Sequence, residues 1–276
     1  LEQPDIILNG AVNGEELGIK SSLEGAVKCA ERWDIPCINH PRAAYETARD
    51  KLAKLLSGID HLIVPKTQFI NHDETDMMDA TISLVESEFD YPLIIRKPMM
   101  QNGLDMHLCT NREEAIASIE EFKSGFFAIQ YIENRVKKGL FRKYRGTFIG
   151  NNFHLTRLDY ATDWKVHGHR NEPHRLAFYE EHSEFIKEEI DTAANPEKFL
   201  GANAMAALFS IRERINLDFF GIDFDVTEDG DVIVFEANAV MNLLCKAGMT
   251  LPHPKASEDA LMADFFQLVE DKIANH

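Results

Sequence analysis

The sequence predicts an α/β protein with a short parallel unit followed by two lobes that mix helices and strands. Up to about Thr67, short apolar runs alternate with helical stretches, and strands separated by helices of this length indicate a parallel sheet of the βαβ type. From Asp73 onward the apolar pattern mixes helices with runs typical of antiparallel strands. We therefore expect α/β topology first and α+β lobes after it.

The composition is that of a folded, acidic chain. Its 276 residues leave room for one large or two modest domains, and 45% hydrophobic with 27% charged residues is close to the average of globular proteins. A formal net charge of −17 repels phosphate backbones and anionic lipid, so nucleic acid and membrane surfaces are poor candidate partners. An anionic substrate would need a local cluster of Arg and Lys, or a bound cation.

The cysteines and the first residues favour a cytoplasmic location. Cys29, Cys37, Cys109 and Cys245 form no C-x-x-C pair, so we expect reduced and mostly buried thiols. The start of the chain lacks the pattern of a signal peptide, and no apolar run approaches the roughly 18 residues of a membrane span. Because the first strand begins almost at once, the sequence also suits a fragment of a longer polypeptide with further domains.

The elements are expected in the following order. The first unit has strands at 6–8, 37–39 and 62–64, with helices at 21–33 and 43–56, the first of them opened by a capping box of Ser21 and Glu24. Later helices are expected at 73–86, 112–122, 196–215 and 258–274, and later strands at 93–97, 106–108, 126–132, 141–149 and 153–158. The polar segment 171–181, which contains Pro173, is expected to be a mobile loop.

The most informative stretch is a predicted hairpin over residues 219–238. Two apolar runs flank Asp229 and Gly230, and this dipeptide is a strong signal for a two-residue turn. With that turn, Asp223 lies directly opposite Glu236, and Asn238 shares their face. Because opposed like charges destabilise a sheet, we expect a positive group between them.

Two carboxylates and an amide oxygen are ligands that suit Mg²⁺, which often shares its coordination shell with substrate phosphates. The residues alone leave two alternatives open. One is a solvated acidic hairpin without a ligand, and the other is a metal-free carboxylate pair that acts as general acid and base.

The run Gly221-Ile222-Asp223, followed by Phe235-Glu236-Ala237-Asn238, resembles the magnesium-binding segment of the ATP-grasp superfamily. Other segments follow in the order of that family, and the likeness covers the chain from about Asp5 to its end. It is strongest to ATP-grasp modules found beside tetratricopeptide repeats, and more distant to glutathione synthetase and glutamate-adding ligases. The resemblance implies an ATP-grasp fold with a short pre-ATP-grasp α/β domain over 1–57, a middle lobe over 58–125 and a carboxyl-terminal lobe over 126–276.

The resemblance also implies a set of site residues. Two lysines look like the phosphate-contacting lysines of the family: Lys51 and Lys97. An interdomain hinge that receives adenine is matched by Gln130, Tyr131, Ile132 and Glu133. Two basic residues look like the pair that faces the γ-phosphate and the acceptor: Arg145 and Arg157, with Lys165 and His167 near them. The metal, Mg²⁺ or Mn²⁺, would be held by Asp223, Glu236 and Asn238.

The activity that the resemblance implies is that of an ATP-dependent ligase, which joins a small-molecule or peptide carboxylate to an amine through an acylphosphate. The phosphate loop of the family is usually glycine-rich, because backbone N–H groups curl over the phosphates. Here the loop over 99–104 contains Gly103 as its one glycine. Two alternatives therefore stay open: a degenerate nucleotide-binding regulatory module, and a small-molecule kinase on the same fold.

Overall fold

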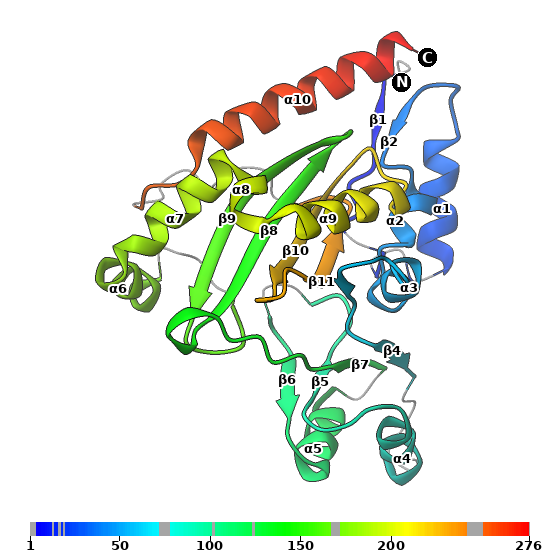
Figure 1. Ribbon diagram of the computed structural model, residues 1–276. Coiled ribbons are helices and arrows are strands. Elements are labelled where there is room, and N and C mark those ends of the chain that lie inside the picture. The colour runs from blue at the N-terminus through cyan, green and yellow to red at the C-terminus, as the bar shows by residue number, and fades with distance from the viewer. Residues whose placement is uncertain are drawn as a thin grey trace.

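The computed structural model describes residues 4–12, 14–15, 18, 20–71, 78–100, 103–122, 125–166, 172–241 and 251–275. These residues form a two-stranded, a four-stranded and a five-stranded sheet, with helices packed on their outer faces (Figure 1). The predicted α/β class is therefore confirmed. In the described part of the chain, no helix is both long enough and apolar enough to cross a membrane.

The first unit is the expected parallel pair. Strand β1 (Ile7–Leu8) pairs in parallel with β2 (Cys37–Ile38), and α1 (Lys20–Ala30) connects them. The helix expected at 43–56 is two helices, α2 (Pro41–Tyr45) and α3 (Arg49–Leu55), because the chain turns through an extended Ala48 between them.

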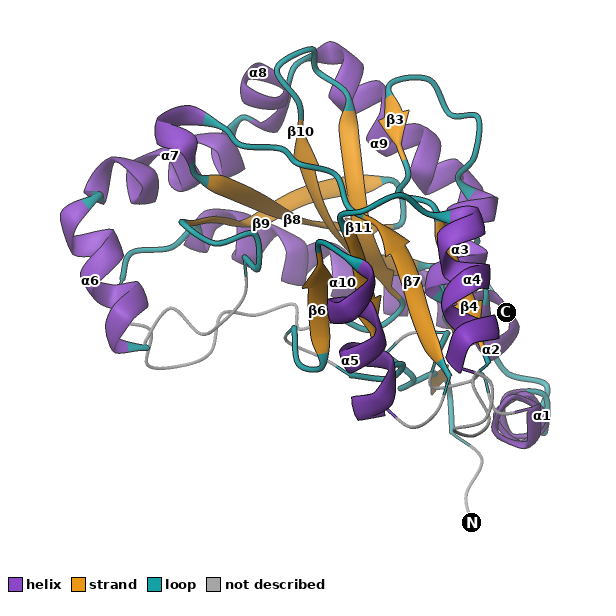
Figure 2. Ribbon diagram, turned by 90° about the horizontal axis from the view of Figure 1, so that it is seen from below, coloured by secondary structure: helices purple, strands orange, loops and turns teal. Residues whose placement is uncertain are grey.

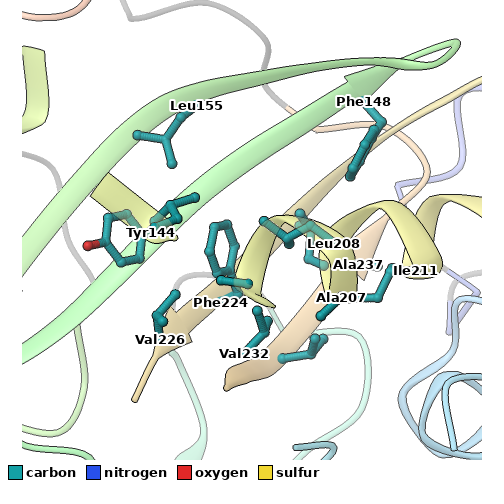
Figure 3. Close-up of a cluster of buried hydrophobic side chains, with 14 of the residues drawn as sticks. Tyr144, Phe148, Leu155, Ala207, Leu208, Ile211, Phe224, Val226, Val232 and Ala237 are labelled. Carbon is teal, nitrogen blue, oxygen red and sulfur yellow. The ribbon is translucent and has the colours of Figure 1, made fainter. Parts of the chain in front are cut away.

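The five-stranded sheet is the centre of the molecule. Its order is β3 (Leu62–Ile63), β11 (Val232–Asn238), β10 (Phe219–Val226), β8 (Phe141–Ile149) and β9 (Asn152–Ala161), all antiparallel except the β3 and β11 pair. The short helix η2 (Lys137–Gly139) precedes β8. The even-numbered residues Tyr144, Phe224 and Val226 face α9 (Ala202–Arg214), which contributes Leu208 and Ile211 to the core (Figure 3). The opposite face of this sheet carries the charged side chains described below.

The four-stranded sheet has the order β4 (Thr67–Ile70), β7 (Phe126–Gln130), β5 (Leu93–Arg96) and β6 (Met106–Cys109), and every pair is antiparallel. Helices α4 (Met78–Glu88) and α5 (Arg112–Phe122) cover it and lie in front of its strands in Figure 2. The sequence analysis places the middle lobe at 58–125. Strand β7 follows residue 125 but belongs to the four-stranded sheet, and β3 lies within 58–125 but belongs to the five-stranded sheet. Sheet membership depends on pairing between distant segments, which the local pattern does not reveal.

The prediction of a mobile loop at 171–181 is wrong for the residues that the structure describes. Helix α6 (Pro173–Glu181) occupies this segment, and α7 (Ser183–Ala194), which the sequence analysis missed, follows it. Proline disrupts a helix interior but suits the first helical position, where Pro173 lies. One turn apart, Arg175 and Tyr179 are both buried and bond to Asp159 of β9. Tertiary contacts, not a hydrophobic pattern, hold this helix.

The last helices pack against the outside of the five-stranded sheet. The helix expected at 196–215 is interrupted by Gly201, whose φ of 85° ends α8 (Pro196–Leu200) before α9 begins. Helix α10 (Lys255–Ala274) lies across the far ends of β8 and β9 (Figure 1) and packs Leu261 against Ile149 and Phe219.

Candidate functional site

A cavity lies between the four-stranded and five-stranded sheets. Its walls come from α3 of the first unit, from β5, β6 and β7 on one side, and from β8, β10 and β11 on the other. The segments that follow β7 and β9 close one end. The three units of the fold therefore all contribute to one site.

One end of the cavity is apolar and is bordered by an extended segment. Three of the residues named for the hinge, Gln130, Tyr131 and Ile132, line it. Apolar side chains line it with them: Leu52, Val64, Ile94, Ile129, Phe141, Val166 and Val234. The backbone N–H of Gln130 donates to the Lys66 carbonyl at 2.8 Å, and the Lys66 N–H donates to Oε1 of Gln130 at 3.1 Å. These bonds fix the hinge against the segment that enters β4. The arrangement offers backbone groups to the edge of a flat, apolar ligand.

The carboxylates of the hairpin lie at the other end. Asp223 of β10 pairs with Glu236 of β11, so the predicted register is confirmed. The predicted two-residue turn is wrong, because the loop spans residues 228–230, and Gly230 adopts a φ of 86°. Phe235 is an extra residue in β11, and this bulge compensates for the longer turn. Asp223 and Glu236 therefore remain opposite each other.

Cations pair with both carboxylates, as the opposed charges require. Arg145 donates to the two oxygens of Asp223 at 2.8 and 2.9 Å, and Nζ of Lys143 lies 3.0 Å from the same carboxylate. Arg49, the first residue of α3, bonds to Glu236. The positive groups expected between the carboxylates are thus supplied by the protein itself.

These pairs shift the pKa values of both carboxyls. Burial alone raises each pKa, but the cations outweigh it. Arg145 and Lys143 hold the pKa of Asp223 below its ordinary value. Arg49 lowers the pKa of Glu236 to about 2, although the charge of Asp223 opposes this shift. Both side chains are therefore ionised at neutral pH.

Arg96, at the end of β5, lines the cavity without an acidic partner. Its residue is 4% exposed, its Nη1 faces the sulfur of Met106, and its Nη2 donates to the Met100 carbonyl. Within the described residues it forms no ion pair, and its Nε has no hydrogen-bond partner. Burial, and then the charge of Arg49, lower the pKa of Arg96 to about 10. A buried guanidinium without an acidic partner among the described residues favours the binding of an anion in the cavity.

The family resemblance implies that Lys97 contacts phosphate, but Arg96 lines the cavity and Lys97 does not. Neighbouring residues of a strand point to opposite faces, so only one of the two can line the site. The Nζ of Lys97 lies 3.6 Å from Asp105 in a partly exposed ion pair. The alternation of residues along the strand indicates that Arg96, and not Lys97, faces the cavity, because Arg96 lies on the same strand face as the cavity residue Ile94.

Lys51 is also outside the cavity. It lies two residues after Arg49 on α3, and two residues correspond to about 200° of helix rotation. The ammonium of Lys51 is 3.9 Å from Glu46 and 4.3 Å from the centre of the Tyr45 ring. Arg49 is the cation of this helix that lines the cavity, beside Leu52 and Ala53, and sequence reasoning missed it because it chose Lys51 from the family resemblance.

Four other predicted residues, Arg157, Glu133, Asn238 and Lys165, are not among those that line the cavity. Arg157 stands opposite Arg145 on β9 and forms an ion pair of 2.5 Å with Asp159. Glu133 accepts a hydrogen bond from the Tyr131 hydroxyl at 2.5 Å and does not line the cavity. Asn238 is buried on β11. Lys165 lies next to the cavity residues Trp164 and Val166, and His167 is outside the described residues.

A further buried ion pair, at Asp225, was not predicted. Nε of Arg142 donates to Asp225 at 2.7 Å, and Nδ2 of Asn134 donates to the other oxygen of Asp225 at 2.5 Å. Burial raises the pKa of Asp225 even though Arg142 opposes this shift. All three residues line the cavity. Only the alternation of Asp223 and Asp225 on one strand face could have indicated this cluster.

The donor set fits a metal that is shared with a ligand. Asp223, Glu236 and Asn238 lie on one face of the β10 and β11 pair and offer the hard oxygens that Mg²⁺ prefers. In the parts of the chain that the structure describes, no three Asp, Glu, His or Cys side chains are grouped so as to hold a metal. Ligand oxygens would therefore have to complete the coordination.

Comparisons with known proteins identify the fold of the chain. No protein-family model and no curated protein matches the chain. Among solved structures, the D-Ala:D-Ser ligase VanG from Enterococcus faecalis has a TM-score of 0.58 and 14% identity, covering 99% of this chain and 73% of its own. A RimK domain ATP-grasp protein from Sphaerobacter thermophilus has a TM-score of 0.55 and 15% identity, with coverage of 99% and 82%.

A third structure, the D-alanine–D-alanine ligase of Bacillus anthracis complexed with ATP, has a TM-score of 0.51 and 14% identity and covers 98% of this chain and 79% of its own. At such low identity the likeness concerns the fold, and it extends over nearly the whole chain. This chain therefore has the ATP-grasp fold, as its sequence predicts.

Proposed function

We propose that the chain is an ATP-dependent ligase that joins a carboxylate to an amine. One observation carries the proposal: a single cavity combines an apolar, hinge-bordered end with a charged end that contains Arg96, a cation without an ion pair among the described residues. This polarity matches a nucleotide, which has an apolar base and anionic phosphates. Solved neighbours of the same fold are named as ligases, and the Bacillus anthracis neighbour is complexed with ATP.

Each end of the nucleotide has a proposed partner. The backbone of Gln130, Tyr131 and Ile132 receives adenine, and Trp164 closes that end of the cavity, 6.1 Å from the Tyr131 ring. Arg96 takes the place that the sequence analysis gave to Lys97 and holds a phosphate. Bidentate guanidinium contacts suit phosphate oxygens.

The hairpin supplies the metal ligands in this proposal. Asp223, Glu236 and Asn238 hold Mg²⁺ or Mn²⁺, which when bound compensates the charge of the phosphates. Arg145 and Arg157 face the γ-phosphate and the acceptor, where they stabilise the transferring phosphoryl group or orient the carboxylate.

The proposed reaction has two steps. A carboxylate oxygen of the substrate attacks the γ-phosphorus, the bond from that phosphorus to the β,γ-bridging oxygen breaks, and ADP leaves with the bonding electrons. The amine nitrogen then attacks the acyl carbon, inorganic phosphate leaves, and the nitrogen loses a proton. Alignment and charge stabilisation supply most of the catalytic effect in such transfers.

Thermal unfolding with ATP, ADP and GTP, each with and without Mg²⁺, is the first test. A nucleotide at about 100 times its dissociation constant raises the free energy of unfolding by about 2.7 kcal/mol if it binds only the folded state. The proposal expects a Mg²⁺-dependent increase for adenine nucleotides, followed by ADP release with a suitable carboxylate and amine. The absence of any increase would contradict it.

A nucleotide-binding regulatory module is the second candidate, because the cations Arg145 and Arg157 are both engaged by aspartates and the phosphate loop is poor in glycine. It would bind ATP and release no ADP with any acceptor pair. A kinase on the same fold would instead give a stable phosphorylated product and no amide.

A further inference from the structure

Each carboxylate that faces the charged end of the cavity is paired with a cation, within the described residues. Asp223 bonds to Arg145 and Lys143, and Glu236 bonds to Arg49. All five side chains are at least three-quarters buried, so water screens these pairs poorly. A metal ion and these cations therefore compete for the same oxygens.

Arg49 and Lys143 can each move away from the carboxylate that they pair with, Glu236 and Asp223 respectively. Nε of Arg49 lies 2.9 Å from Glu15, so Arg49 keeps one acidic partner if it moves away from Glu236. Asp223 keeps both bonds from Arg145 if Lys143 moves away, and the lysine stem is flexible. Arg145, in contrast, is fixed by its two parallel bonds.

We infer that Arg49 and Lys143 are phosphate ligands that occupy the metal-binding carboxylates in the free protein and exchange partners when nucleotide and metal bind together. In this exchange the phosphates take the two cations, and Glu236 and Asp223 become available to the metal. The inference rests on the proposed function, since it assumes that a phosphorylated ligand enters this cavity.

The charge balance of the site supports the exchange. Among the residues that the structure describes, four cations, Arg49, Arg96, Lys143 and Arg145, stand against the carboxylates of Asp223, Glu236 and Glu15, which leaves a surplus of one positive charge. A divalent cation alone would enlarge this surplus, and a nucleoside triphosphate alone would reverse it strongly. Only the two together keep the buried site near neutrality, so their binding is coupled.

Titration with Mn²⁺ in the absence of nucleotide tests the exchange, with the electron paramagnetic resonance signal of free Mn²⁺ as the readout. The wild-type protein is expected to bind Mn²⁺ weakly. Arg49→Met and Lys143→Met are each expected to bind it at least roughly tenfold more tightly, which corresponds to about 1.4 kcal/mol. The same variants should bind ATP more weakly than the wild type when EDTA removes the metal.

Two control variants separate the exchange from a general charge effect. Lys51→Met removes a cation from the same helix outside the cavity and should leave Mn²⁺ affinity unchanged. Arg49→Lys keeps the charge and should bind Mn²⁺ as weakly as the wild type. If Arg49→Met is unstable because Glu15 and Glu236 lose their partner, Mn²⁺ should raise its unfolding temperature more than that of the wild type.

Three results would overturn the inference. They are tight Mn²⁺ binding by the wild-type protein alone, an equal gain in Lys51→Met, or no gain in either cavity variant. Because the Mn²⁺ titration contains no nucleotide, its result does not depend on whether ATP binds. A gain in Mn²⁺ affinity without any effect of nucleotides on thermal unfolding would refute the proposed function and the phosphate part of the exchange, and would leave the competition between metal and cations standing.

Discussion

Arg145 binds Asp223 through two parallel hydrogen bonds, of 2.8 and 2.9 Å, across the β8 and β10 strand pair. Both residues face the cavity side of the five-stranded sheet, and Asp223 is 1% exposed. A bidentate pair of this kind fixes the orientation of both planes. Asp223 is therefore an organising charge of the sheet as well as a candidate metal ligand.

Replacing Asp223 with Asn is expected to destabilise the folded protein. The change leaves Arg145 and Lys143 buried without their carboxylate, and breaking one side of a buried pair typically costs about 3–5 kcal/mol. Urea unfolding gives the free energy directly. Asp229→Asn, in the exposed turn of the same hairpin, is the matched control and should change stability little. A similar small effect for both variants would show that the buried pair contributes nothing.

Replacing Arg96 with Met is expected to separate stability from binding. Met removes a buried cation that has no acidic partner in the described part of the chain, so the free energy of unfolding should rise by about 1–2 kcal/mol. Affinity for ATP should fall at the same time, because a phosphate ligand is lost. Lys97→Met, one residue away on the opposite strand face, should do neither. Thermal unfolding with and without nucleotide measures both effects, and weaker ATP binding in Lys97→Met alone would restore the original assignment.

Replacing Arg157 with Ala is expected to remove turnover and spare ATP binding. The fold should tolerate the change, because Asp159 keeps its contacts with Arg175 and the Tyr179 hydroxyl, each at 3.2 Å. ADP release and nucleotide affinity are measured on the same preparation. If ATP affinity falls as far as in Arg96→Met, the placement of Arg157 at the acceptor end is wrong.

The predicted elements were most accurate where one periodic pattern fills a segment. The helix at 112–122 and the strand at 141–149 have the predicted bounds. The buried apolar residues of the helix, Ala115, Ile119 and Phe122, all face one core. The opposition of Asp223 and Glu236 was also confirmed, although a bulge at Phe235 produces it together with a longer turn. The sequence analysis predicted neither the longer turn nor the bulge, and their effects on the pairing of Asp223 with Glu236 cancel.

The cations of the site were harder to predict than its carboxylates. Choosing between Arg96 and Lys97, or between Arg49 and Lys51, requires knowing which face of the strand or helix lines the cavity, since a shift of one residue in a strand or two in a helix reverses the face. The α6 helix was missed because its buried face consists of Arg175 and Tyr179, whose partners on β9 are distant in sequence. The likeness to modules beside tetratricopeptide repeats stays a prediction.

Two glycines provide a contrast in packing. A methyl group at Gly146, in β8, would overlap the Phe153 ring and touch Phe224, so Gly146→Ala is expected to cost about 1–3 kcal/mol. Gly25, inside α1, has open space around the same position, so Gly25→Ala should stabilise by about 0.5–1 kcal/mol. Urea unfolding of the two variants compares them, and destabilisation by Gly25→Ala would contradict the described packing of α1.

The acid stability of the protein is expected to depend on Glu236. Its folded-state pKa is lowered from 4.5 to about 2, so its charge contributes stability that is fully present above about pH 4.5 and is lost as the pH falls toward 2. In that window the unfolded chain binds a proton that the folded chain does not, and one proton corresponds to about 1.4 kcal/mol per pH unit. Glu236→Gln should therefore lose stability less steeply than the wild type between these pH values, while Glu228→Gln, in the exposed turn, should follow the wild-type slope. Equal slopes for the Glu236 variant and the wild type would show that Arg49 does not hold this carboxylate in its charged form.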